Sequence, residues 1–207
     1  MTATDVARPK RRREATVERL LDAALETFAE QGFAAASVED ICRRGGFTRG
    51  AFYSSFRTKD ELFAALMTRE VERDLSRVAD LLTGLAGEDD PVTAVVDRCL
   101  GAFRQDRTWT LVVTEYALHA ARHPAAAELL RRHQAGFRTE LVALIEQAAD
   151  EVGVQLTVTA DALARALAAL HDGVTLHCLS EPDDGDDLER SALLLLLRGA
   201  VAGRPTP

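Results

Sequence analysis

The stretch SVEDICRRGGFTRGAFYSSF, residues 37–56, decides the fold of this chain. Ser37 and Asp40 form a helix-start signal, and the glycine pair Gly45–Gly46 ends the short helix that they begin. Thr48 is a suitable cap for a second short helix. Two helices joined by a tight glycine-containing turn are typical of a helix-turn-helix, a unit whose second helix enters the major groove of DNA.

The second helix of this pair, expected over residues 48–56, has two contrasting faces. Phe52 and Phe56 are four residues apart, so they share one side of the helix, and that side is predicted to be buried. The opposite side of the helix is centred between Gly50 and Ser54, where the side chains are absent or small. A face of this kind is well suited to a close approach to a partner surface.

The residues around that face can provide the contacts that a major groove requires. Arg49 can pair with a guanine edge, and Ala51 can contact a thymine methyl group. Gly50 allows the helix backbone to come near, and the free amides at the helix N-terminus can receive a phosphate. Contacts to phosphates are expected from three further side chains, those of Thr48, Tyr53 and Ser54.

Outward from this stretch, the sequence is helical in pattern almost throughout. Apolar residues recur with helical spacing, no segment shows convincing strand-like alternation, and Gly, Pro and Asp clusters mark the breaks. Thr58 and Glu61 form a capping box that begins a long helix. The predicted fold is all-α, with helices at 13–30, 37–44, 48–56, 58–82, 91–105, 109–122, 125–151, 160–179 and 187–202.

Charge is distributed unevenly along the 207 residues, whose net charge is −8. Residues 1–60 contain 11 Lys/Arg and 9 Asp/Glu, a net charge of +2, whereas residues 61–207 contain 14 and 24, a net charge of −10. Because an acidic body repels nucleic acid, we expect any DNA contact to lie in the N-terminal part.

The composition also indicates a compartment. The longest apolar run, residues 192–197, is far too short to span a bilayer, and the basic N-terminus is not followed by an apolar segment. The three cysteines, Cys42, Cys99 and Cys178, are widely spaced and include no CxxC pair. This usage fits reduced thiols, so we expect a cytoplasmic protein.

Several pieces of residues 14–67 together resemble the TetR family of bacterial transcriptional regulators. They are LLDAALETFAEQGF (20–33), SVEDI (37–41), GGFTRGAFYSSF (45–56) and KDELF (59–63). The resemblance implies a basic arm (1–12), a helix-turn-helix domain (13–58) and a ligand-binding and dimerisation domain (59–207). It also implies a repressor that a small molecule releases from a palindromic operator. The DNA-contacting positions that it implies are Ser37, Thr48, Arg49, Gly50, Ala51, Tyr53, Ser54 and Lys59.

The chain departs from the family pattern at three positions. Cys42 stands where alanine is common, Phe47 where valine is more usual, and Ser55 where histidine is frequent. The first two change packing, whereas the third removes a potential phosphate contact. Arg11–Arg13 resemble basic arms that reach the neighbouring groove, and a solvated tail is the alternative interpretation of these residues.

For the second half of the chain, the resemblance implies a homodimer through helices 160–179 and 187–202. The segment SALLLLLRGAVAG is apolar nearly all round, so it must be covered on both sides, by a second subunit or by the chain's own core. A ligand pocket is implied among the preceding helices, although ordinary packing is an alternative for each candidate. The candidate lining residues are Phe103, Trp109, Val113, Tyr116, Phe137, His171 and Thr175.

Two other functions are compatible with parts of the sequence. Cys42 lies inside the DNA-binding unit, so its oxidation could regulate the protein, although buried thiols are usually inert. Glu115, His119 and His123 follow each other at four-residue spacing, which would suit a metal carrier or a helical enzyme. His123 is also explained as a favourable partner for a helix C-terminus, and no catalytic motif accompanies the three residues. We therefore expect no enzyme, no cofactor and no metal.

Overall fold

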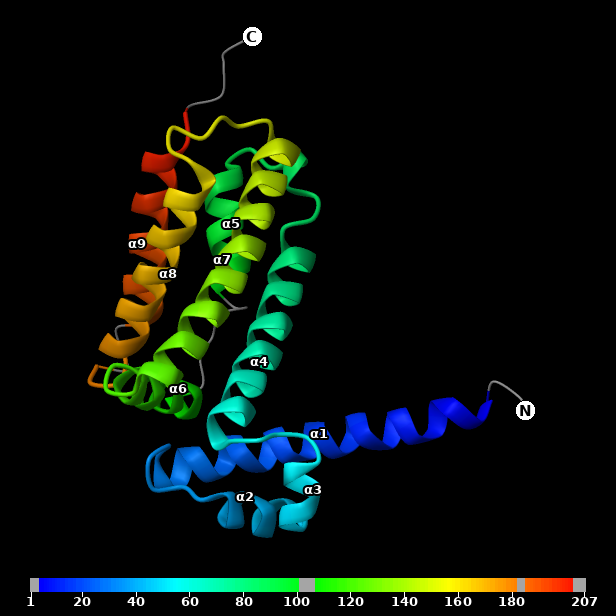
Figure 1. Cartoon of the computed structure of the whole chain (residues 1–207). Coiled ribbons are helices and arrows are strands. Elements are labelled where there is room, and N and C mark those ends of the chain that lie inside the picture. Colours follow the sequence, from blue (N-terminus) through cyan, green and yellow to red (C-terminus); the bar gives the residue numbers. More distant parts are fainter. Residues whose placement is uncertain (1–3, 101–106, 182–184, 203–207) are drawn as a thin grey trace. The chain divides into compact units, whose positions relative to one another are not determined.

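The computed structural model describes residues 4–100, 107–181 and 185–202. Within these ranges the chain forms nine α-helices and one short 3-10 helix, and its extended pairing is limited to an isolated bridge between Leu156 and Val201 (Figure 1). The all-α prediction is confirmed. The helices are α1 (Thr4–Gln31), α2 (Val38–Gly45), α3 (Arg49–Tyr53), α4 (Lys59–Leu81), η1 (Leu85–Gly87), α5 (Pro91–Leu100), α6 (Arg107–Ala120), α7 (Pro124–Val152), α8 (Ala160–His177) and α9 (Gly185–Ala200).

Among the described residues, two helices differ from their predicted bounds by more than two residues. α1 begins at Thr4 rather than at residue 13, so the helix runs through Pro9, which has no amide hydrogen to donate to the preceding turn. α3 ends at Tyr53 rather than at residue 56, because the Ser55 amide donates at 2.9 Å to the Phe52 carbonyl, three residues back, instead of the Ala51 carbonyl that a continuing α-helix would use. The last predicted residues of α5, 101–105, lie outside the described ranges.

The chain packs as two compact units. The first contains Met1–Arg69 and Thr108–His133, and the second contains Glu70–Arg107 and Gln134–Pro207. This grouping differs from a division at residue 58, because the start of α4 and most of α6 pack with the N-terminal helices. The aromatic residues of α6 explain that difference.

The core of the first unit is aromatic. Tyr116 of α6 stacks on Phe63 of α4 with ring centroids 3.8 Å apart, and it meets Phe33 edge to face at 4.8 Å. Phe28 at the end of α1 completes the cluster, and all four side chains are fully buried. Such rings bury large apolar areas, so this cluster fixes α1, α4 and α6 together as the support on which α2 and α3 rest.

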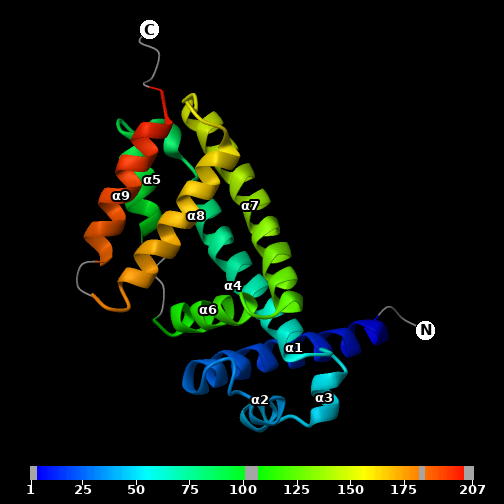
Figure 2. The same ribbon diagram turned by 60° about the vertical axis from the view of Figure 1, so that its left-hand side comes forward.

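The second unit is a bundle of α5, α7, α8, α9 and the later part of α4. Figures 1 and 2 both show α8 and α9 lying side by side in opposite directions. Arg190 and Arg198 of α9 pair with Asp97 and Asp90 at 2.8 and 2.9 Å, which attaches α9 to the α5 region. None of the described helices is both long and apolar enough to cross a membrane.

Candidate nucleic-acid interface and ligand cavity

The first helix of the helix-turn-helix begins with a complete capping box. The Ser37 hydroxyl accepts the Asp40 amide at 3.1 Å, and the Asp40 carboxylate accepts the Ser37 amide at 3.2 Å and its hydroxyl at 2.5 Å. These hydrogen bonds from Ser37 lower the pKa of Asp40. The predicted helix start is confirmed, and the Ser37 hydroxyl is committed to the cap.

The turn between α2 and α3 requires both of its glycines. Gly46 has a φ of 71°, in the left-handed region that side chains disfavour. Gly45 has ordinary backbone angles, but a Cβ atom there would lie 2.8 Å from the Phe47 ring. Arg19 of α1 holds the turn from behind, since it donates to the Gly45 carbonyl at 3.0 Å and its guanidinium lies over the Phe47 ring.

The second helix, α3, presents the two faces that its sequence predicts. Phe52 and Phe56 are buried, whereas Tyr53 is 50% exposed. The Thr48 hydroxyl caps the helix by accepting the Ala51 amide at 3.2 Å. A Cβ atom at Gly50 would meet no other atom closer than the Thr48 hydroxyl, at 3.7 Å. The outer edge of α3 is therefore bare and open to a partner.

Arg49 points along this edge but already has partners. Its guanidinium pairs with Glu39 of α2 at 2.6 Å and lies 5.8 Å from the centre of the Tyr53 ring. The two charged side chains are each more than half exposed, so the pair is weak and can be exchanged for a nucleic-acid contact. The sequence predicted Arg49 for the interface but did not indicate Glu39 as its competitor.

Lys59 lies differently from the other predicted DNA contacts. Its ammonium donates to the carbonyls of Phe33 and Ala36 at 2.5 and 2.7 Å, with a longer contact to Ala34, and it lies 4.4 Å from the centre of the Phe33 ring. Burial lowers the pKa of Lys59. The side chain therefore fastens the start of α4 to the α1–α2 loop, because its donors are taken up by backbone carbonyls.

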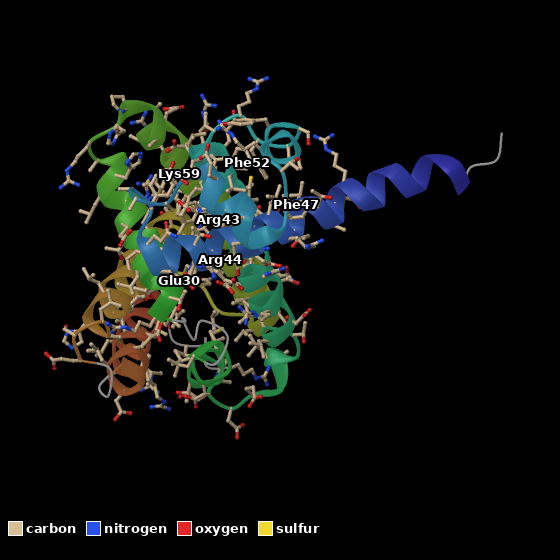
Figure 3. All side chains as sticks on the ribbon, turned by 90° about the horizontal axis from the view of Figure 1, so that it is seen from below. Glu30, Arg43, Arg44, Phe47, Phe52 and Lys59 are labelled. Atoms are coloured by element: carbon tan, nitrogen blue, oxygen red, sulfur yellow. The ribbon has the colours of Figure 1, made fainter. Side chains whose placement is uncertain are left out.

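The remaining arginines of α2 are also paired with acids. Arg44 contacts Glu26 at 3.2 Å and Glu30 more closely, and Figure 3 labels Arg44 and Glu30 close together in the same region as Arg43. Arg43 pairs with Asp40. These ion pairs reduce the positive field at the surface of the helix-turn-helix.

The second unit contains a partly open cavity of about 210 Å³. Among the described residues, its lining is apolar except for four residues, Cys99, His171, Asp172 and Glu189. His171 and Glu189 are 3.4 Å apart. The apolar wall is formed by Val78, Leu82, Pro91, Val92, Val95, Val96, Phe137, Leu141, Leu144, Ile145, Ala148, Ala149, Val152, Val154, Leu156, Leu163, Leu167, Ala168, Leu193, Leu197 and Val201.

Comparison with family models assigns both parts of the chain. Residues 20–66 match the model for bacterial regulatory proteins of the tetR family, and residues 88–203 match the model for the C-terminal part of BetI-type transcriptional repressors. The chain belongs to the tetR family. Its members are transcriptional regulators rather than enzymes, so the resemblance seen in residues 14–67 is confirmed.

Named relatives agree with this assignment. The chain is 32% identical to the regulator UidR of Escherichia coli over 128 residues, which span 62% of this chain and 63% of UidR. It is 29% identical over 182 residues to the nicotine-responsive repressor HdnoR of Paenarthrobacter nicotinovorans, covering 83% and 89% of the two chains. Salmonella enterica GusR has the same fold, with a TM-score of 0.70, 27% identity, and coverage of 89% of this chain and 96% of GusR.

In this tetR-family chain, the structure places the predicted ligand-pocket residues in different units. Phe137 and His171 line the cavity of the second unit, but Thr175 does not. Trp109, Val113 and Tyr116 belong to the first unit, where Tyr116 is buried in the aromatic core and its hydroxyl donates to Asp60 at 3.3 Å. Phe103 lies outside the described residues. Composition alone could not separate core aromatics from cavity aromatics, and Asp172 and Glu189 were missed because isolated acids resemble surface residues.

The Glu115, His119 and His123 series has local partners that explain it. The Glu115 carboxylate accepts the Phe33 amide at 2.7 Å, His119 lies 3.4 Å from Asp60, and the His123 ring bonds to the His119 carbonyl at 2.8 Å. The described residues contain no group of three potential ligands that could hold a metal ion. Glu115 and His119 therefore join α6 to the α1–α2 loop and to α4, whereas His123 follows the end of α6 and bonds locally.

The cysteines give no support to redox regulation. Cys42 is buried, and its thiol donates to the Thr48 carbonyl across 3.7 Å. Burial, with a smaller contribution from Glu39, raises its pKa, so the reactive thiolate is disfavoured. Burial also raises the pKa of Cys99 in the cavity wall to about 11.

Proposed function

We propose that this chain is a dimeric repressor that binds a near-palindromic operator through α3 and leaves it when a small apolar ligand occupies the cavity. The observation that carries the proposal is the pairing of an exposed, nearly bare α3 edge with an apolar cavity in a separate unit of the same chain. A surface for DNA and a separate cavity for a ligand are the two sites that allosteric release requires.

The DNA contacts in this proposal come from the α3 edge and its cap. Thr48, Arg49, Gly50, Ala51, Tyr53 and Ser54 are the proposed contact residues. Ser37 and Lys59 have a different part, since their polar atoms hold the ends of α2 and α4 and so position α3.

A second copy of the chain is the proposed cover for α8 and α9. Leu195 is 78% exposed, and Leu188, two turns earlier on the same side of α9, is 39% exposed. Leu176 of α8 is 54% exposed. Large side chains exposed together on adjoining helices mark an association surface, and a two-fold dimer places two α3 helices on successive half-sites.

Ligand control is proposed from the cavity and from chain connectivity. α4 and α7 each begin in the first unit and end in the second, so a shift of either helix around a ligand reaches both. The relative HdnoR is named as a nicotine-responsive repressor, which supports the same mode of control for this chain.

The test is fluorescence anisotropy with the DNA upstream of the chain's own gene, at two salt concentrations. A fragment of equal length with scrambled sequence is the control. We expect a preference of about 1,000-fold for the upstream DNA, and a footprint with two half-sites about one helical turn or a multiple apart. Equal, weak and strongly salt-dependent binding to both fragments would contradict operator recognition at this site.

A further inference from the structure

Most positive side chains around the helix-turn-helix are already bound within the protein. Residues 13–69 contain eight Lys and Arg residues, and six of them have a polar partner in the same chain. These six are Arg19, Arg43, Arg44, Arg49, Lys59 and Arg69. Each of them must give up part of its internal contact before it can bind a phosphate, so each contributes less to DNA binding than a free cation would.

Arg57 differs from these six. Its side chain is exposed, and its guanidinium has no hydrogen bond or ion pair to the residues that the structure describes. Arg13 shares this property, but it lies on α1, before the helix-turn-helix. Within residues 37–59, all of which are described, Arg57 is therefore the cation that can bind an anion without losing an internal partner.

The backbone at Arg57 is held on both sides. The Phe56 amide donates to the Phe52 carbonyl at 2.9 Å, and the Phe56 side chain is buried. The Arg57 amide donates to the Glu61 carboxylate at 2.7 Å, and the Glu61 amide donates to the Thr58 hydroxyl at 3.0 Å. Glu61 thus fixes the backbone of Arg57 but leaves the guanidinium free. A side chain on a fixed backbone loses less freedom on binding than one on a mobile loop.

Helical spacing places Arg57 beside the exposed side of α3. The bond from the Phe56 amide to the Phe52 carbonyl has the spacing of an α-helix, so the chain makes a helical turn beyond the end of α3. Arg57 follows Tyr53 by four residues and Ser54 by three, which puts it on their side of that turn. All three of these residues are exposed. Arg57 therefore extends the proposed DNA-contacting edge of α3 towards α4.

We propose that Arg57 contacts a DNA phosphate beside α3 and takes the part that the family resemblance implies for Lys59. The inference rests on the proposed function, because it adds a contact to the same DNA surface. A guanidinium can bind a phosphate through two parallel hydrogen bonds. Such a contact positions the protein but reads no base, so it should strengthen binding to every DNA sequence alike.

The experiment measures DNA affinity by fluorescence anisotropy over a range of salt concentrations, for the full-length parent, Arg57→Gln and Arg57→Lys. We expect Arg57→Gln to bind operator DNA about tenfold more weakly at physiological salt, because a hydrogen bond to a charged group is lost. The slope of log affinity against log salt should become shallower by about one. Arg57→Lys keeps the charge and should keep the slope. Affinity for a scrambled fragment should fall by the same factor as affinity for the operator.

The matched control is Arg122→Gln, which removes the same charge elsewhere in the first unit. Arg122 is exposed just after α6, and its guanidinium donates to the Leu118 carbonyl at 3.0 Å. This variant should keep the affinity and the salt slope of the parent. Urea unfolding should give the same midpoint for Arg57→Gln and the parent, because the Arg57 guanidinium has no partner to lose among the described residues.

Three results would overturn the inference. The first is Arg57→Gln with the affinity and slope of the parent, and the second is a shallower slope in Lys59→Met but not in Arg57→Gln. The third is a loss of affinity confined to the operator, which would indicate base reading. Failure of the proposed function is seen in the parent instead, as equal binding to upstream and scrambled DNA. In that case the salt slope on either fragment still tests Arg57.

Discussion

At the scale of single residues, the α3 edge offers side chains suited to a DNA contact, but its arginine is already paired within the protein. Arg49 is the side chain best suited to a base edge, and Glu39 holds it at 2.6 Å in the free protein. Gly50 leaves the helix backbone bare, with no atom close enough to oppose a side chain. Each of these observations leads to a substitution whose effect on DNA binding differs from its effect on stability.

Removing the competitor should strengthen binding. Glu39→Gln frees Arg49 and removes a negative charge beside the proposed DNA surface, so operator affinity should rise about threefold, which is within the range expected for an exposed ion pair. Arg49→Ala should weaken binding and relax sequence preference. Anisotropy titrations measure both, with Glu146→Gln as a variant of equal charge change elsewhere. Weaker operator binding by Glu39→Gln would show that Glu39 positions Arg49 instead of competing for it.

Substitutions at Gly50 should separate folding from DNA binding. Gly50→Ala should raise the unfolding free energy by about 0.5–1 kcal/mol, because alanine loses less backbone entropy in a helix. Gly50→Leu has the same open space in the free protein, but its side chain would project from the proposed DNA-facing edge. We expect a folded protein with at least about tenfold weaker operator binding, measured by urea unfolding and anisotropy. Unchanged affinity of Gly50→Leu would place the DNA on another face.

At the scale of elements, short polar contacts fix the geometry of the helix-turn-helix. Ser37 and Thr48 cap α2 and α3, and Lys59 attaches α4 to the carbonyls of the α1–α2 loop. On the other side of that loop, Glu115 of α6 accepts the Phe33 amide. The loop is thus held by α4 and α6 at once, which makes the orientation of α2 and α3 depend on both helices.

A substitution at Lys59 can separate two roles of this side chain: holding the start of α4 in position, or contacting a DNA phosphate. Lys59→Met keeps the length of the side chain but leaves the Phe33 and Ala36 carbonyls without this donor, so the unfolding free energy should fall by about 1–3 kcal/mol. Operator affinity should fall with little change in its salt dependence. A phosphate contact would instead reduce the salt slope by about one with little loss of stability. That second pattern would contradict the positioning role.

At the scale of the whole molecule, stability and association should respond to pH and to the exposed leucines. Burial, with a further contribution from His123, lowers the pKa of His119, and Asp60 opposes the shift. Burial also lowers the pKa of His133. The folded protein therefore binds fewer protons than the unfolded chain just below the usual histidine pKa.

The sign of the pH effect follows from those two histidines. The contribution of their neutral forms to the free energy of unfolding is fully present above the unfolded-state histidine pKa of about 6.5. It is lost as pH falls through the lowered pKa values of the folded state. Urea midpoints should therefore fall between about pH 7 and pH 5, where the carboxylates remain mostly ionised. The double variant His119→Gln and His133→Gln should flatten this slope, and His177→Gln should keep it. A parent midpoint that rises on acidification would contradict the assignment.

Association should depend on α9. Leu195→Glu places a charge at the centre of the proposed dimer surface, so it should yield monomers by light scattering and weaken operator binding by about tenfold or more. Gln147→Glu adds the same charge to an exposed position of α7 and should remain dimeric. If the parent itself is monomeric at micromolar concentration, the dimer proposal fails.

The sequence by itself determined the all-α fold, the capped helix-turn-helix and the burial of Phe52 and Phe56, because caps, glycine stops and helical spacing act over a few residues. It could also identify the family from residues 14–67. Only the tertiary structure decided that Tyr116 belongs to the aromatic core, that Lys59 faces carbonyls, and that Asp172 and Glu189 line one cavity. These placements depend on contacts between helices far apart in the chain, for which local spacing carries no information.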